Sequence, residues 1–323
     1  MKVGFVSENS QNPNDVIITS PGNFGFPNCI IAVKINPSMV NRLIVLLTDF
    51  GALDPFVGIM KGVIAGIAPE TRTIDLTHEL PPGDIRRAAI TLWQAVPFFP
   101  SSTVFLAVVD PGVGTPRRPL FIQSGAGIPG EEYIFIGPDN GLFSFVLSDP
   151  FQAWELAEPA FRLPQSSATF HGRDIFAPAA AHATRSVPGS AFGPPVLDPL
   201  RLPTPRLESV APGSLSGEIL FADRFGNYLT SLGIFKRPQE GRLHFQPWLP
   251  GVSPQSFAAQ ETRLILPGGA RLPLVDTFGL IPPGEIAMLI GSSGLLEIAA
   301  NRGSAAELLH LAEGAEVIFT TSR

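Results

Sequence analysis

The chain has 323 residues, of which 45% are hydrophobic and only 15% are charged, and its formal net charge is −6. An acidic chain with evenly mixed charges excludes the basic surface that a nucleic-acid backbone requires, so no nucleic acid is expected as a partner. Charged residues usually make up about 25% of a soluble chain, so this composition indicates extensive burial in a core or between subunits.

Residues 1–42 differ in composition from the rest, because Asn, Ser, Pro and Gly recur there around one short apolar run, 29–33. We expect a leader outside the compact fold, with Met39 as an alternative start; an ordinary ordered extension is an equal alternative. The lone cysteine, Cys29, excludes an intrachain disulfide and a cysteine-based metal cluster. The chain shows neither a signal-peptide pattern nor an apolar run of about 18 residues, so a cytoplasmic protein without a membrane partner is expected.

Residues 43–190 alternate between strand-like and helix-like patterns. Strands are predicted over 43–49, 72–77, 103–109 and 133–136, and helices over 57–67, 84–96 and 175–183. Asp84 is a suitable N-cap for the second helix, because its carboxylate can accept from the first free backbone N–H groups. The alternation predicts an N-terminal α/β domain with a mixed, largely parallel sheet.

Residues 191–214 are rich in Pro, Gly and Ser and are predicted to form a linker. Residues 215–323 follow as short apolar runs separated by turn residues, with few helical patterns. The runs cover 215–222, 228–234, 263–266, 286–290, 295–299 and 316–320. This pattern predicts a smaller, C-terminal all-β domain, a barrel or a sandwich.

Polar, glycine-rich turns follow most of the predicted N-terminal strands. In an open α/β sheet the ligand binds beyond the carboxyl ends of the strands, so these turns predict a common cleft. Taken singly, an Asp after a strand is more often a turn or capping residue. The acids and histidines of these turns also offer a set of metal ligands, but no pair is closely spaced and the metal signal is weak. The set is Asp49, Asp75, His78, Asp110, Asp139 and His171.

Six short motifs occur in order along the chain: T-D-F-G at 48–51, D-L-T-H at 75–78, D-P-G-V-G-T-P-R-R at 110–118, G-P-D-N-G at 137–141, F-H-G-R-D at 170–174 and F-G-N at 225–227. Together they resemble the S-adenosyl-L-methionine (SAM) hydroxide adenosyltransferase family, or SAM hydrolases, to which fluorinase and chlorinase are related. The resemblance extends from Leu43 to the C-terminus. It implies hydrolysis of SAM to adenosine and L-methionine, without a cofactor or a metal. It also implies a homotrimer that binds substrate between the N-terminal domain of one subunit and the C-terminal domain of the next.

The resemblance assigns the water-holding triad of the family to Asp110, Arg117 and His171. Two structural alternatives stay open: His171 as a cap of the following helix, and Arg117 as a paired surface charge. The resemblance further matches Asp49 with the ribose hydroxyls, Asn227 with the adenine edge, Asp223 with the methionine ammonium and Ser292 with its carboxylate, and it places Phe170, Gly172 and Phe278 at the pocket. For Phe278, packing in the core is an equal alternative.

The chemistry of this reaction requires activation of the nucleophile rather than of the leaving group. Sulfur leaves C5′ as a neutral thioether, so no general acid is needed, whereas water must be desolvated, aligned and partly deprotonated. The imidazole of His171 could accept or relay the proton, Arg117 could stabilise hydroxide and Asp110 could orient the group. The residues alone do not decide which group takes the proton.

The rival interpretations are a SAM-dependent halide transferase, a non-catalytic adenosine or SAM binding protein and, more distantly, a hydrolytic metal enzyme. Halide transfer is disfavoured, because the halogenases carry Tyr at the position of Asp110 and Thr at that of Val113, and fluorinase carries a halide-contacting Ser at that of Gly172. Two further departures affect substrate contacts. Phe56 replaces a Tyr of some members, and Ser293 replaces an Arg of the fluorinases.

Overall fold

The computed structural model describes residues 15–19, 30–34, 43–239 and 241–321. The chain divides into two compact units, Met1–Leu202 and Pro203–Arg323, and this boundary falls inside the predicted linker, 191–214. Within the predicted leader, strand β1 (Asp15–Thr19) pairs antiparallel with strand β2 (Ile30–Lys34). The other leader residues, Met39 included, lie outside the described ranges.

The first unit is built around one mixed sheet. Its strands are β3 (Leu43–Thr48), β4 (Arg72–Thr77), β5 (Val104–Val108), β6 (Pro119–Ser124), β7 (Tyr133–Pro138) and β8 (Phe151–Glu155). They are ordered β4-β3-β5-β7-β6-β8. The pairs among β4, β3, β5 and β7 are parallel, whereas β6 runs antiparallel to both β7 and β8. The predicted α/β domain with a mixed, largely parallel sheet is confirmed.

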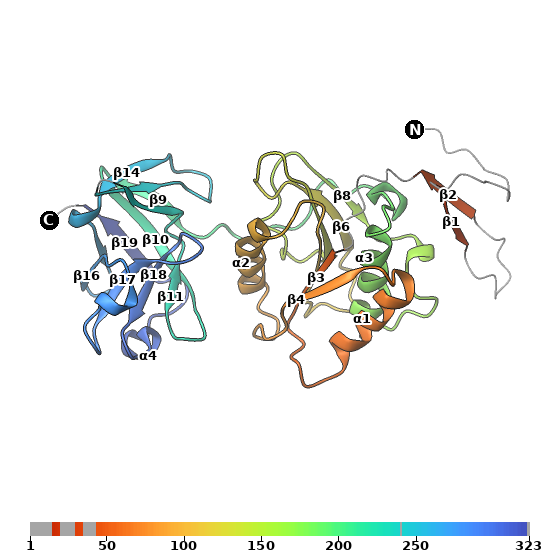
Figure 1. Cartoon of the computed structure of the whole chain (residues 1–323), viewed down its shortest axis with the longest axis horizontal. Helices are drawn as coiled ribbons and strands as arrows, with labels where there is room; N and C mark the ends of the chain where they lie inside the picture. The colour runs from red at the N-terminus through yellow and green to blue at the C-terminus, as the bar shows by residue number, and fades with distance from the viewer. Residues whose placement is uncertain (1–14, 20–29, 35–42, 240, 322–323) are drawn as a thin grey trace. The chain divides into compact units, whose positions relative to one another are not determined.

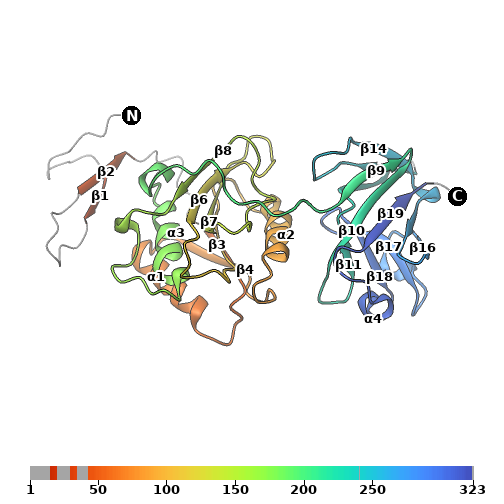
Figure 2. The same cartoon turned by 180° about the vertical axis from the view of Figure 1, so that it is seen from behind.

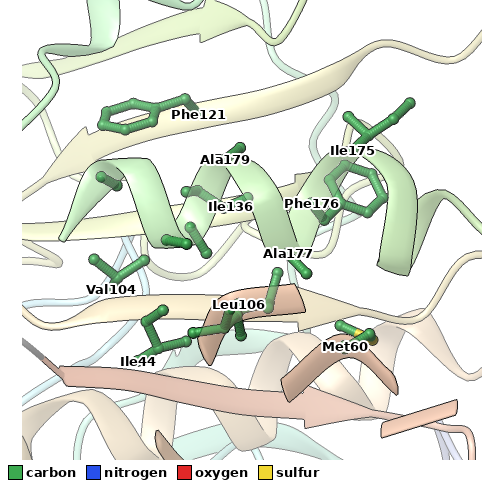
Figure 3. Close-up of a cluster of buried hydrophobic side chains, with 14 of the residues drawn as sticks. Ile44, Met60, Val104, Leu106, Phe121, Ile136, Ile175, Phe176, Ala177 and Ala179 are labelled. Atoms are coloured by element: carbon green, nitrogen blue, oxygen red, sulfur yellow. The ribbon is translucent and has the colours of Figure 1, made fainter. Parts of the chain in front are cut away.

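Helices cover both faces of this sheet (Figures 1 and 2). Helices α1 (Phe56–Ile67) and α3 (Ala177–Ala183) share a core with the even-numbered residues of β3 and β5, such as Ile44 and Leu106. Figure 3 shows this core. Helix α2 (Ile85–Ala95) shares a second core with the odd-numbered residues. Because successive strand residues point to opposite faces, uninterrupted apolar strands fill both cores.

The predicted N-cap of α2 is present in the structure, whereas two strands and one helical turn differ from the sequence prediction. The Asp84 carboxylate accepts from the Arg87 N–H at 2.9 Å, as predicted for the N-cap of α2. The sequence prediction misses β6, which opens with a proline, and β8, a short edge strand with a half-polar pattern. Before α3 the chain forms a π-helical turn, η4 (Gly172–Phe176), where an α-helix is predicted from residue 175. The 3₁₀ turns of this unit are η2 (Val96–Phe98), η3 (Pro159–Phe161) and η5 (Gly189–Ala191).

The second unit consists mainly of short antiparallel strands. They are β9 (Leu207–Ala211), β10 (Ser214–Ala222), β11 (Tyr228–Thr230), β12 (Phe235–Gln239), β13 (Arg242–Phe245), β14 (Gln255–Ala258), β15 (Arg263–Ile265), β16 (Arg271–Pro273), β17 (Ile286–Ile290), β18 (Leu296–Ala300) and β19 (Glu316–Thr320). The helical segments are η6 (Ala259–Glu261), η7 (Phe278–Leu280) and α4 (Ala305–Leu309).

The strands of the second unit form a nearly closed, barrel-like sheet. Its order is β16-β15-β19-β10-β11-β18-β17, with β9 beside β10, and β12, β13 and β14 form a separate sheet. Leu274, directly after β16, makes a β-bridge to Met288 in β17, which brings the two outer strands together. The predicted C-terminal all-β barrel is therefore confirmed. Across the described ranges, no helix is both long and apolar enough to cross a membrane.

A buried histidine in α3 makes the stability of the first unit sensitive to acid. His182 packs edge-on against Phe161 at 5.1 Å between ring centroids, and burial lowers its pKa to about 4. Between about pH 6.5 and 4, His182 is protonated in the unfolded chain but stays neutral in the folded chain. The free energy of unfolding therefore falls as the pH falls. From this shift we expect His182 to account for a loss of about 3 kcal/mol by pH 4.

Urea unfolding at several pH values measures this effect. The variant His182→Gln should lose part of the acid dependence, whereas His244→Gln, at an exposed position, should retain it. The pKa of His171 is also lowered, so some dependence should persist in His182→Gln. An unchanged slope in His182→Gln would contradict the prediction.

Candidate active site

The loop after β5 carries two of the predicted catalytic residues, Asp110 and Arg117. It meets the segment before η4 at Gly114, where φ is +78° and an added Cβ would lie 2.4 Å from the carbonyl oxygen of Ala168. Only glycine combines the left-handed backbone with this close approach. Gly114 thereby allows the loop to reach the segment that ends at His171.

The structure brings Asp110, Arg117 and His171 together in one hydrogen-bonded cluster. Arg117 Nε donates to Asp110 Oδ1 at 2.6 Å, and Nη2 donates to Asp110 Oδ2. The same Nη2 lies 2.9 Å from Nδ1 of His171. The side chains of Arg117 and Asp110 are only 8% and 4% exposed, so Arg117 is not a surface charge. Two parallel bonds to one carboxylate fix the plane of the guanidinium, which also lies over the ring of Phe176.

His171 is held in a defined protonation state by its neighbours. It occupies the N-cap position of η4, but its side chain makes no capping hydrogen bond. Since a guanidinium nitrogen can only donate, Nδ1 of His171 accepts from Arg117, and the neutral ring carries its proton on Nε2. Burial lowers the pKa of His171, and the charge of Arg117 lowers it further, against the opposing charge of Asp110. The imidazole is therefore neutral at neutral pH.

Asp174, a buried residue of the F-H-G-R-D motif, fixes the backbone that carries His171. Its carboxylate accepts from the Ser167 N–H at 2.7 Å and from Arg173 Nε at 2.5 Å, and its carbonyl accepts from the Leu163 N–H. Burial alone would raise the pKa of Asp174, but these hydrogen bonds outweigh burial and lower it. No role is predicted for Asp174 from the sequence, although its place in the F-H-G-R-D motif is a usable signal.

Asp49 follows β3, the parallel neighbour of β5, and so lies at the same edge of the sheet as Asp110. Its Oδ2 accepts from the Gly83 N–H at 2.8 Å. Gly83 in turn lies close to Pro111, because an added Cβ would be 3.8 Å from the Pro111 side chain. The backbone at Gly83 therefore lies between Asp49, the predicted ribose-binding acid, and the loop that carries Asp110.

Phe170 belongs to an aromatic cluster beside the triad. Its ring meets those of Phe56 and Phe50 edge-on, with centroids 5.3 and 6.1 Å away. Gly172 is buried next to it, and an added Cβ would lie 3.1 Å from the sulfur of Met60 and 3.2 Å from the Phe170 ring. A serine at position 172 would therefore require its neighbours to shift. These rings give the first unit an apolar wall close to His171.

The remaining predicted substrate residues lie in the second unit. Asp223 and Asn227 contact each other directly: Asn227 donates to Asp223 from its backbone N–H at 2.9 Å and from Nδ2 at 3.0 Å. Asn227 is buried, whereas Ser292 is exposed. Phe278 is 46% exposed, so the alternative of a core position does not fit it. The structure thus pairs Asp223 with Asn227 and leaves Phe278 and Ser292 on the surface of this unit.

The other acids named as metal-ligand candidates have cationic partners of their own. Asp75 pairs with Lys61 Nζ at 2.6 Å, and His78 Nδ1 lies 2.8 Å from the hydroxyl of Thr48. Buried Asp139 accepts from Arg118 Nε at 2.8 Å. Among the described residues, no group of three or more His, Cys, Asp or Glu side chains is arranged to hold a metal ion.

Asp139 of the G-P-D-N-G motif and its partner Arg118 bond to residues near the end of the first unit, Leu200 and Asp198, and not to the triad. Asp139 accepts from the Leu200 N–H at 2.7 Å, and Arg118 also donates to Asp198.

Asp139→Ala leaves the Leu200 N–H and part of the Arg118 guanidinium without a partner, and we expect a loss of about 2–3 kcal/mol of stability. Because Asp139 contacts no triad residue, kcat should stay within about twofold where the variant is folded. Urea unfolding and steady-state kinetics test this, and a lower kcat at unchanged stability would contradict it.

A hollow of about 510 Å³ exists elsewhere in the first unit. It is lined mainly by the residues that join β6 to β7 and by the start of β8, among them Ser124, Ile128 and Gln152. Ser124 pairs with Tyr133 at the amino end of β7. The hollow therefore lies at the opposite edge of the sheet from Asp110, and the triad is not part of it.

The family of the chain follows from comparison with known proteins. The profile described as the SAM hydroxide adenosyltransferase N-terminal domain matches residues 44–193, and that of the C-terminal domain matches residues 217–318. The chain belongs to the SAM hydroxide adenosyltransferase family.

Three relatives show the range of similarity. An (R)-S-adenosyl-L-methionine hydrolase of Thermus thermophilus is 41% identical over 287 residues, which cover 85% of this chain and 98% of that protein. A fluorinase of Actinoplanes sp. is 29% identical over 311 residues, covering 88% and 99%. A crystal structure of an uncharacterized conserved protein from Thermotoga maritima matches with a TM-score of 0.69 at 30% identity, covering 85% and 99%.

Proposed function

We propose that this protein hydrolyses SAM to adenosine and L-methionine by in-line attack of water on C5′. The observation that carries the proposal is the buried cluster in which Arg117 joins Asp110 to His171. Family membership and the higher identity to a SAM hydrolase than to a fluorinase support it. SAM is the substrate, and no cofactor is proposed.

The cluster suits the activation of a water molecule. The oxygen of water forms a bond to C5′ while the C5′–S bond breaks, and the electron pair leaves with sulfur in the neutral thioether of methionine. The proton must leave the water early, because hydroxide is the better nucleophile. Arg117 stabilises the negative charge that develops on the oxygen, and the low exposure of its side chain strengthens that interaction.

We assign the proton to Asp110 and not to His171. Nδ1 of His171 already accepts from Arg117, so neutral His171 offers the water only the Nε2–H donor. Each oxygen of Asp110 accepts one bond from Arg117 and has a further lone pair for the water. Asp110 therefore takes the proton, and His171 donates to the water oxygen and directs it.

The other predicted residues hold the two ends of the substrate. In the first unit, Asp49 binds the ribose hydroxyls, and Phe170 and Gly172 line the pocket. In the second unit Asn227 binds adenine, Asp223 and Ser292 bind the amino-acid end, and Phe278 covers the pocket. We propose a homotrimer in which the first unit of one subunit meets the second unit of the next, and a cytoplasmic location.

Incubation of the pure protein with SAM in H₂¹⁸O tests the proposal. We expect equal amounts of methionine and adenosine, with one ¹⁸O at the 5′ position. Chelators should not change the rate. Formation of 5′-methylthioadenosine or S-adenosylhomocysteine would contradict the proposal.

The same assay separates the rival functions. Added fluoride or chloride should yield no 5′-halo-5′-deoxyadenosine, because the carboxylate of Asp110 repels an anion near C5′. A halide-dependent product would indicate a halide transferase. Calorimetric binding of SAM without turnover would indicate a binding protein.

Asn227→Ala should weaken binding more than it slows the chemistry. Asn227 contacts Asp223 and belongs to no part of the triad, so its amide is available to both ground state and transition state. Loss of one such contact costs about 1–1.5 kcal/mol, so we expect KM to rise about tenfold at nearly constant kcat. A fall in kcat at constant KM would contradict this role.

A further inference from the structure

The D-L-T-H motif at 75–78 contributes no residue to the triad, although it ends a strand at the same edge of the sheet. Its first three residues complete β4, and β4 pairs parallel with β3. His78 therefore lies beside the turn that follows β3, the T-D-F-G motif at 48–51. This turn carries Asp49, the predicted ribose-binding acid.

His78 holds the T-D-F-G turn at both ends. Its carbonyl accepts from the Gly51 N–H at 2.8 Å, and its ring nitrogen Nδ1 lies 2.8 Å from the hydroxyl oxygen of Thr48. The Thr48 hydroxyl also accepts from the Phe50 N–H at 3.3 Å. Asp49 lies between Thr48 and Gly51 along the chain, so the two contacts of His78 fix the backbone from which the Asp49 side chain extends.

The surroundings of His78 determine which group donates in its bond with Thr48. Nε2 of His78 lies 3.1 Å from Oδ1 of Asp75, in a geometry too bent for a full hydrogen bond. Burial would raise the pKa of Asp75, but Lys61 and His78 outweigh burial and lower it, so this carboxylate is charged at neutral pH. A ring nitrogen without a proton would be repelled by that charge, so Nε2 carries the proton. In the neutral imidazole Nδ1 is then the acceptor, and the Thr48 hydroxyl donates to it.

The two polar groups of this contact are shielded from solvent. Thr48 is completely buried, and only 10% of the His78 side chain is exposed. Their hydrogen bond therefore acts inside the protein and supports the turn. The carboxylate of Asp49 is held from the other side, because its Oδ2 accepts from the Gly83 N–H at 2.8 Å. Its Oδ1 is the oxygen that we assign to the ribose.

We propose that His78 and Thr48 are positioning residues for nucleoside binding, which hold the T-D-F-G turn so that Asp49 is directed at the two ribose hydroxyls before the substrate binds. This inference rests on the proposed function for the role of Asp49. A carboxylate that is already held in place loses less conformational entropy on binding than a mobile one, so the hydrogen bond between Thr48 and His78 contributes to affinity.

Calorimetry with two nucleosides tests the inference on the full chain. Thr48→Val keeps the shape of the side chain and removes its hydroxyl, and this variant should bind adenosine about 10-fold more weakly than the wild type. It should bind 2′,3′-dideoxyadenosine, which lacks both ribose hydroxyls, with wild-type affinity. A merely structural role would not distinguish the two nucleosides. Thr71→Val is the matched control, because its hydroxyl pairs with that of Thr184 at 2.8 Å, and it should leave both affinities unchanged.

Conservative variants and a double mutant provide the second readout. Thr48→Ser keeps the hydroxyl, and His78→Asn offers an amide oxygen as the acceptor in place of Nδ1, so both should bind adenosine within about threefold of the wild type. In an Asp49→Asn background, Thr48→Val should cause no further loss of adenosine affinity, because the group that it positions is already absent.

Each outcome decides the inference separately from the proposed reaction. Unchanged adenosine affinity in Thr48→Val, or an equal loss for both nucleosides, would overturn the positioning role even if SAM is hydrolysed. A wild-type protein that binds the two nucleosides equally would also overturn it, since Asp49 would then make no ribose contact. Selective loss of adenosine affinity in a protein that does not turn over SAM would support the positioning role and reject the proposed reaction.

Discussion

His171→Ala is expected to lower kcat by about 10²-fold or more, the usual scale for loss of a preorganised hydrogen-bond donor at the reacting group. The imidazole contacts Arg117 through Nδ1, so its Nε2–H is the donor that we assign to the nucleophilic water. Alanine removes this donor and leaves Nη2 of Arg117 with Asp110 as its remaining partner. The KM for SAM should change less than kcat, because His171 is assigned to the nucleophilic water and not to SAM.

The control for this variant is another histidine. His244→Ala removes an exposed imidazole in the second unit and should retain the wild-type rate. Adenosine affinity should be equal in all three proteins, which would show that the His171 variant is folded and keeps its nucleoside contacts. A wild-type kcat in His171→Ala would remove His171 from the mechanism.

The lowered pKa of His171 also predicts the acid limb of the pH profile. Burial and Arg117 keep the ring neutral, so it gains a proton only below its ordinary value of 6.5. A proton on Nδ1 ends the hydrogen bond from Arg117 and places two cations side by side. Activity should therefore be constant above about pH 6.5 and fall at lower pH. In His171→Ala the residual activity should lose this limb; an identical limb would assign it to another group.

Much of the fold could be predicted because the first unit follows local rules. The apolar runs before Asp49 and after Thr103 are buried on both faces, and such runs are distinctive in sequence. β6 and β8 escape prediction because their stability comes from antiparallel pairing across the sheet and not from their own residues. In the second unit, β12–β14 are missed for the same reason.

Only part of the site could be predicted from residue types, because some of its residues lie far apart along the chain. Asp110 and Arg117 lie in one motif, but His171 is 54 residues beyond Arg117, and only the fold joins them. The resemblance to a family gave this pairing, which residue types alone did not.

Arg117→Met should have the largest effect of any single substitution in the triad. Arg117 alone holds Asp110 and His171 together, so its loss separates the proton acceptor from the donor that directs the water. We expect kcat to fall about 10³-fold, the upper part of the range for removal of a preorganised charge stabiliser. The buried Asp110 also loses its partner, and breaking a buried pair costs about 3–5 kcal/mol of stability.

Arg117→Lys separates the role of charge from that of geometry. Lysine keeps the positive charge, but a single ammonium cannot reproduce the planar fork that bonds both oxygens of Asp110 and also reaches Nδ1 of His171. Its stability should lie between those of the wild type and Arg117→Met, whereas kcat should still fall about 10²-fold. The adjacent Arg118→Lys is the matched control, because Arg118 bonds Asp139 and Asp198 outside the triad. Equal losses of kcat in the two lysine variants would show that general destabilisation, and not the bridge through Arg117, limits the reaction.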